Sequence, residues 1–317
     1  MALDHYVSQV HLRNFYSPTL GGERMYAIRK RDGRKFACDS ESVCRTDEGS
    51  TNSYLTEPRI VEDFLKTIEP KYNASVEKLR SGDVDHEAIY VIAGFVAYAA
   101  TCSPAAMRIG KGPLRGSLEA TAAILDSQGK LPPAPASLGG KSLTDLLAEG
   151  TVTFTIDEKY PQAIGISNVI GHLGNFGNFA WDILLNHEPG SPFFTSDFPV
   201  GIEDTPDPRV LNRVVPLAPD VVVRIRPELT SEGATDLKFP NFRCRRVAVR
   251  GSEVRGLNRT IVQSAENLVF FRDDAPWVSQ FVDRHRRFRI EPLIDNIPTP
   301  NGQVVLSRQR LMEQEPA

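Results

Sequence analysis

A stretch of twenty residues, from Ala88 to Met107, carries no charged side chain. This length meets the minimum for a membrane span. The stretch is rich in alanine, contains Tyr90 and Tyr98, and reaches Pro104 before its end, and it lacks the density of Leu, Ile and Phe that favours insertion. We therefore expect a helix buried at the centre of a soluble protein, with no membrane partner.

Helical periodicity is typical of the first half of the chain. Apolar residues between Ile60 and Leu79 recur at helical spacing, which predicts a helix from Thr56 to Arg80 with a kink at Pro70. Further helices are expected near 114–127 and at 141–149. The first half is therefore expected to be mainly α-helical.

Short β-prone runs separated by turns dominate the second half. A late helix is expected after Ser252, which suits the N-cap position. Helices followed by strands predict an α+β fold with a mostly antiparallel sheet. The predicted strands lie at 152–156, 180–185, 192–195, 214–217, 221–225, 246–249 and 268–271.

Composition divides the 317 residues into four parts. The first is a helical part with a docked N-terminal segment and a hairpin around Asp32-Gly33. A Pro/Gly-rich linker, a sheet-rich basic part and a C-terminal tail follow. The same parts could also form one integrated domain. Their ranges are 1–128, 129–140, 141–289 and 290–317.

Cysteine usage and the first residues indicate the compartment. The four cysteines are scattered and form no CxxC pair, which is typical of buried free thiols in a reducing environment. The start Met1-Ala2-Leu3-Asp4 lacks the basic and apolar regions of a secretory signal. We therefore expect a cytoplasmic protein.

The net charge of −3 hides an asymmetry between the two halves of the chain. Residues 1–208 carry 19 Lys and Arg against 27 Asp and Glu, whereas residues 209–289 carry 16 against 9. A basic lobe on an acidic body can attract an anionic small molecule or nucleic acid. It could equally bind the acidic half of its own chain, or of a second copy in a homo-oligomer. Alternating arginines in 243–250 put like charges on one strand face, which favours a bound anion.

The first fifteen residues are dense in polar and aromatic groups, with His5-Tyr6-Val7-Ser8-Gln9 followed by Leu12-Arg13-Asn14-Phe15. Chain ends fray unless packing holds them, so this segment is expected to dock. It resembles the start of domain of unknown function 4238, whose members begin His-Tyr-Val-Pro-Gln and continue Leu-Arg-Asn-Phe. The stretches Phe194–Pro199 and Leu257-Asn258 are similar to that family too. The resemblance implies a fold and adds Asn258 as a candidate for substrate binding, but it brings no assigned activity.

Asp197 is the first candidate for chemistry. It follows a predicted strand, and Phe198-Pro199 prevents that strand from continuing. Polar side chains at strand ends, on loops held by a scaffold, are common in functional sites. The alternative is a structural turn, in which Ser196 and Asp197 bind backbone amides.

Glu69 is the second candidate because it falls on the apolar stripe of the predicted 56–80 helix. A buried carboxylate must be paired, hydrogen-bonded or protonated. Arg13 and Arg108 are the expected partners, in a structural ion pair. The alternative role is a general base or a metal ligand.

His5, Gln9 and Arg13 form the third candidate group because they follow one another at i, i+4 spacing. His5 could transfer protons or bind metal. It could instead anchor the terminus by bonding the backbone. Gln9 and Arg13 are candidates for substrate binding, together with Arg108 at the end of the charge-free stretch.

Several familiar catalytic motifs are absent, including HExxH, the P-loop and GxSxG. The run Gly171–Gly177 imitates a phosphate loop but lacks a βαβ unit, so we expect a flexible loop there. The favoured hypothesis is a hydrolase of a phosphoester or nucleic acid, with His5, Glu69 and Asp197 as catalytic residues and a divalent metal as a conceivable cofactor. The rival is a non-catalytic interaction module with a buried polar network. An open cavity favours the first and a buried network the second.

Overall fold

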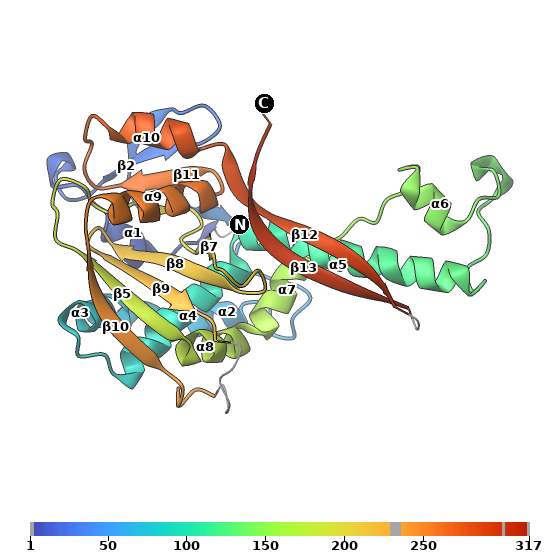
Figure 1. The fold of residues 1–317 in the computed structure, drawn as a ribbon, viewed down its shortest axis with the longest axis horizontal. Coiled ribbons are helices and arrows are strands. Elements are labelled where there is room, and N and C mark those ends of the chain that lie inside the picture. Colours follow the sequence, from blue (N-terminus) through green and yellow to red (C-terminus); the bar gives the residue numbers. More distant parts are fainter. Residues whose placement is uncertain (1–2, 229–235, 300–301, 316–317) are drawn as a thin grey trace.

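The computed structural model describes residues 3–228, 236–299 and 302–315. Its body contains sheets covered by helices. An arm made of α5 (Pro104–Ser127) and the ribbon of β12 (Phe288–Thr299) and β13 (Gly302–Glu313) projects from that body (Figure 1). Helices concentrate in the first half and strands in the second, which confirms the predicted α+β class.

Helix α4 (His86–Cys102) is the predicted central helix. The Ala88 amide donates to Asp85 at 2.9 Å and so caps its N-terminus. Most of its side chains are buried, as predicted, and α4 packs against α2, α3 and α8. Among the described residues, no single helix is long and apolar enough to cross a membrane; α4 and α5, bent by 60°, reach that threshold together by length and composition only.

The predicted long helix is divided in two. Helix α2 (Ile60–Ile68) and helix α3 (Tyr72–Ser81) are joined by the 3-10 turn η2 (Glu69–Lys71). Pro70 lacks a backbone N–H, so it interrupts the helical hydrogen bonds as expected. Glu69 therefore lies at a break in the helix, where its side chain can leave the apolar stripe.

The larger sheet has five strands in the order β10-β5-β9-β8-β7. All pairings are antiparallel except β10 with β5. On β5, Ile183 packs with α4 and α8 (Val169–Asn178), and Leu184 packs with α9 (Ser252–Ser264) on the other face. The strands are β5 (Ala180–Asn186), β7 (Gly201–Asp204), β8 (Leu211–Ala218), β9 (Val221–Arg226) and β10 (Arg243–Val249).

The smaller sheet joins distant parts of the chain in the order β3-β2-β11-β6. The hairpin predicted at Asp32-Gly33 is present, and its strand β2 pairs with β11. Close by, β1 (Leu3–His5) pairs with β4 (Arg45–Asp47) and leads into α1 (Gln9–Arg13). The strands of this sheet are β2 (Met25–Arg29), β3 (Lys35–Cys38), β6 (Thr195–Ser196) and β11 (Leu268–Phe271).

The C-terminal ribbon lies along α5. A Cβ atom on Gly112 would lie 2.6 Å from Pro292 Cγ, and one on Gly116 would lie 2.6 Å from Ile294 Cγ2, so both glycines permit this close approach. Most described residues of the 290–317 part belong to this ribbon. The remaining elements are η1 (Pro18–Leu20), η3 (Ala136–Leu138), α6 (Leu143–Ala148), α7 (Lys159–Ser167) and α10 (Val278–His285).

Three local predictions were wrong in whole or in part. Of the strand predicted at 192–195, only Thr195 belongs to a strand, β6. Residues 152–156 form no strand, and the supposed loop Gly171–Gly177 lies inside helix α8. Leu173 of that run is buried, and a Cβ on Gly177 would lie 2.3 Å from a Phe239 ring atom. Packing against α4 and Phe239 therefore outweighs the low helix propensity of glycine.

Candidate functional site

The N-terminal segment docks into the body as predicted. Leu12 and Phe15 are fully buried, and α1 contacts α3. Tyr98 of α4 donates to the His5 carbonyl oxygen at 3.0 Å, which holds β1 against the central helix. These contacts place His5, Gln9 and Arg13 on fixed backbone.

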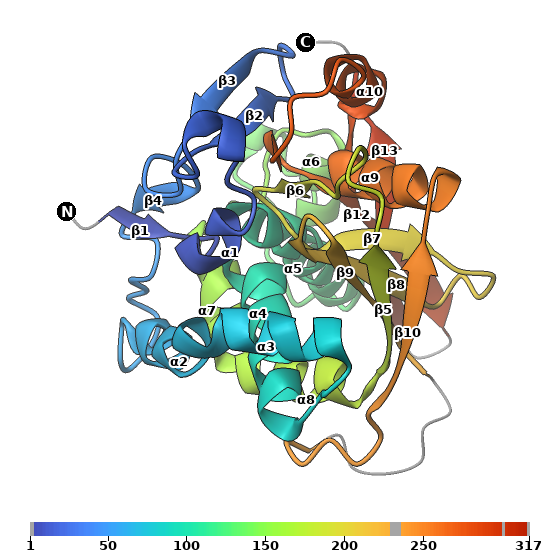
Figure 2. The same cartoon turned by 90° about the vertical axis from the view of Figure 1, so that its left-hand side faces the viewer.

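An open cavity of about 400 Å³ lies between this segment and helix α2, which are neighbours in Figure 2. It brings together four of the predicted site residues: His5, Gln9, Arg13 and Glu69. The other charged side chains in its lining form ion pairs with residues outside the lining: Asp4 and Glu62 with Arg59, and Lys66 with Asp63.

A chain of hydrogen bonds orients the His5 ring. Arg13 has only donors, so Gln9 must present its oxygen, which accepts from Arg13 Nη2 at 2.8 Å. The Gln9 amide nitrogen then donates to His5 Nδ1 at 3.3 Å. In the neutral ring the proton consequently lies on Nε2, 3.4 Å from the Glu41 carbonyl oxygen.

Glu69 is half-buried at the edge of this cavity. Burial raises the pKa of its carboxyl group above the ordinary value, and the nearby Ser8 hydroxyl acts in the opposite direction. The expected ion pair with Arg13 or Arg108 is absent, since no ion pair of Glu69 occurs within the described chain. A desolvated carboxyl group without a cation therefore faces an open cavity.

His11 is a buried residue that the sequence reasoning missed. Its ring bonds the Tyr72 hydroxyl through Nδ1 and the Thr195 hydroxyl through Nε2, both at 2.8 Å. Burial lowers the pKa of His11 to about 3. The available signal was its spacing of four residues from Phe15, which is buried beside it just after α1 ends. His11 joins α1, α3 and β6 and is shielded from solvent.

Asp197 lies outside the cavity of His5 and Glu69. It is 3% exposed, and its two oxygens accept from the Glu266 and Asn267 amides at 3.0 and 2.8 Å. Burial raises the pKa of Asp197 to about 7, although these amides and the Lys30 ammonium oppose the rise. The structure therefore matches the alternative reading of a residue that binds backbone amides.

The side-chain amide of Asn258 also forms hydrogen bonds to the backbone. It is fully buried, accepts from the Phe194 amide at 2.9 Å and donates to the Pro192 carbonyl oxygen at 3.0 Å. These bonds hold the segment that leads into β6 against α9. Asn258 does not line the His5 cavity, so the structure offers no contact between it and a ligand there.

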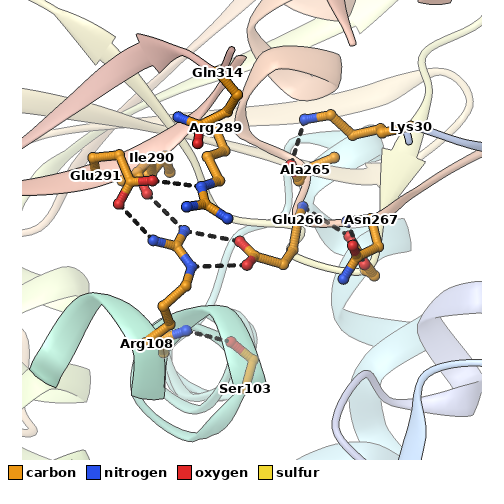
Figure 3. A network of polar contacts seen from close by, with 12 residues as sticks. Lys30, Ser103, Arg108, Ala265, Glu266, Asn267, Arg289, Ile290, Glu291 and Gln314 are labelled. Carbon is orange, nitrogen blue, oxygen red and sulfur yellow. Dashed lines mark hydrogen bonds and ion pairs between the residues drawn. The ribbon is translucent and has the colours of Figure 1, made fainter. Parts of the chain in front are cut away.

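Arg108 belongs to a separate network at the base of the arm (Figure 3). Its guanidinium makes a bidentate pair with Glu266, at 2.8 and 2.9 Å, and contacts Glu291 at 2.7 Å. It also donates to the Ile290 carbonyl oxygen at 2.7 Å. Arg289 binds the other oxygen of Glu291. Arg108 thus ties α5 to β12 and to the loop before β11, instead of meeting Glu69.

The arginines of β10 contact groups of this chain. Arg245 Nε donates to the buried Asp182 at 2.6 Å, in the register that pairs the two residues on β10 and β5. Arg243 pairs with Glu228, and Arg246 donates to the Arg80 carbonyl oxygen. Their like charges are therefore balanced in part by acceptors within the protein.

The cavity chemistry consists of an acid, an imidazole, an amide and a guanidinium. Within the part of the chain that the structure describes, no group of three or more His, Cys, Asp or Glu side chains is arranged to hold a metal ion. A carboxyl group whose pKa is raised by burial can take part in proton transfer, and a guanidinium can hold an anion. The arrangement is thus suited to general acid–base work on an anionic compound.

The fold and this cavity define an α+β protein whose N-terminal segment forms part of a site. The family model described as protein of unknown function (DUF4238) matches residues 4–275, and the chain belongs to that family. The match ends before α10 and the C-terminal ribbon. No curated protein and no solved structure matches the chain.

Proposed function

We propose that the protein is a hydrolase of a small anionic phosphoester, with Glu69 as its general acid–base group. The observation that carries this proposal is a partly desolvated carboxyl group, without an ion pair among the described residues, that lines an open cavity with His5 and Arg13. In a catalytic site the functional groups converge on an open cavity, whereas in a structural network they are buried away from solvent.

In this proposal Arg13 binds the phosphoryl oxygens, helped by the amide of Gln9. Glu69 accepts a proton from the attacking water while the oxygen of that water forms its bond to phosphorus. The same proton then passes to the leaving oxygen as its bond to phosphorus breaks. His5, in its Nε2–H form, supplies a donor beside the reacting group.

The test is a screen of the purified protein against phosphodiester and nucleotide substrates with Mg²⁺, Mn²⁺ or Zn²⁺. Glu69→Gln keeps the shape of the side chain but removes its proton transfer, so activity should fall by about 10²–10⁴-fold. Glu119→Gln, at an exposed position of α5, is the matched control and should keep full activity.

Stability separates a catalytic defect from a folding defect. The raised pKa means that Glu69 contributes stability below its ordinary pKa and loses that contribution as pH rises through the raised value. Glu69→Gln should therefore be at least as stable as the wild type at pH 8. No hydrolysis of any substrate, or equal rates in wild type and Glu69→Gln, would refute the proposal.

The second candidate function is a non-catalytic interaction module. It is favoured by the buried bonds of His11, Asp197 and Asn258, which lock distant segments together. In that case Glu69→Gln changes only the stability of the protein, and the screen detects no hydrolysis of any substrate with any of the metals.

A further inference from the structure

A larger cavity of about 690 Å³ lies between helix α8, the β7–β8 hairpin and the C-terminal ribbon, which runs beside the ends of these strands (Figure 1). Four arginines and one histidine line it, against a single carboxylate, Asp204. The ribbon is outside the region that the family model matches, so this cavity needs a part of the chain beyond that match.

Arg213 is the central cation of this cavity. Its one hydrogen bond within the described chain goes from Nη1 to Gln309 Oε1 at 2.8 Å, and no carboxylate there pairs with it. Arg213 is half-buried, and burial lowers the pKa of its guanidinium to about 10. A guanidinium has five N–H donors, and most of those on Arg213 have no acceptor in the described chain.

The other arginines that line this cavity differ in whether a carboxylate pairs with them. Arg209 and Arg308 pair with Asp207 and Asp295, at 2.7 and 2.6 Å. Arg310 lies opposite Glu291 in the ribbon, but the Glu291 carboxylate binds Arg108 and Arg289 instead.

Arg213 and Arg310 are thus two guanidinium groups that lack a carboxylate partner among the described residues. Asp204 forms an ion pair with neither. The His172 ring lies near Arg213, whose charge adds to burial in lowering the pKa of His172.

Apolar side chains form the other side of the cavity, notably Phe176, Phe179 and Leu293. We propose that this cavity binds a phosphate monoester with an apolar ring, its phosphate on Arg213 and its ring on the apolar side. The Arg213 guanidinium has no carboxylate partner in the described chain and presents donors that suit two phosphate oxygens, and the volume is in the range of small-molecule sites. The proposal is independent of the hydrolase function and uses none of the residues of the Glu69 cavity.

Gln309→Glu tests this assignment with little change in shape. The new carboxylate stands where the Gln309 oxygen accepts from Arg213, so the protein supplies its own anion to that guanidinium. The thermal midpoint should rise, which also shows that the variant folds. Gln314→Glu adds the same charge directly after β13, outside the cavity lining, and is the matched control.

Isothermal titration calorimetry of the full chain should use adenosine 5′-monophosphate, inorganic phosphate and adenosine. We expect adenosine 5′-monophosphate to bind more tightly than either of its parts, with at least a tenfold loss in Gln309→Glu and in Arg213→Gln and none in Gln314→Glu. Absence of binding to the wild type, unchanged affinity in Gln309→Glu, or inorganic phosphate binding as tightly as the nucleotide would each overturn the proposal.

Discussion

His11 is a fully buried histidine beside aromatic rings, and this burial disfavours its charged form in the folded protein. Its pKa of about 3 lies below the ordinary value of 6.5. The stability that neutral His11 contributes is therefore present above about pH 6.5 and is lost as pH falls toward 3. Linkage limits this loss to about 1.4 kcal/mol per pH unit.

We expect His11→Gln, which cannot take up this proton, to be less stable than the wild type at pH 7 and to lose less stability between pH 6.5 and 4. Denaturant unfolding at several pH values measures both. His187→Gln, at an exposed position, should retain the steep wild-type dependence. Parallel curves for the wild type and His11→Gln would show that His11 titrates normally.

At the scale of elements, the contact between α5 and the ribbon depends on glycine. An alanine at Gly112 gains helix propensity but places Cβ at 2.6 and 2.8 Å from two atoms of the Pro292 ring, which cannot rotate away. We expect Gly112→Ala to destabilise the protein by about 1–3 kcal/mol in denaturant unfolding. Gly171→Ala, in α8 with open space around it, should instead stabilise the protein by up to about 1 kcal/mol. A stabilised Gly112→Ala protein would mean that the ribbon adapts easily.

At the scale of the whole molecule, segments far apart in sequence share each core. Strand β2 pairs with β11, and α4 shares a hydrophobic cluster with β5 and β9. We expect one cooperative thermal transition. Protease cleavage within 129–140 should leave two fragments that elute together in gel filtration. Two separate transitions, or fragments that separate without denaturant, would indicate independent domains.

Local pattern determined the elements of this protein. The charge-free run at 88–107 predicts the central helix, Pro70 predicts the break between α2 and α3, and short runs of β-branched residues predict β8 and β9, because periodicity and backbone chemistry act over a few residues. The grouping of His5, Gln9 and Arg13 could also be predicted from the sequence, because their i, i+4 spacing falls within one short helix and the residues just before it.

Only the tertiary structure decided which polar residues share a cavity. Glu69 joins His5, whereas the carboxylate of Asp197 is occupied by amides from the loop before β11, and Arg108 is bound to Glu266 and Glu291. Arg213 gains its cavity from a ribbon close to the C-terminus. These outcomes depend on long-range packing and on which acceptors burial leaves available, and neither is encoded in the spacing of residues along the chain.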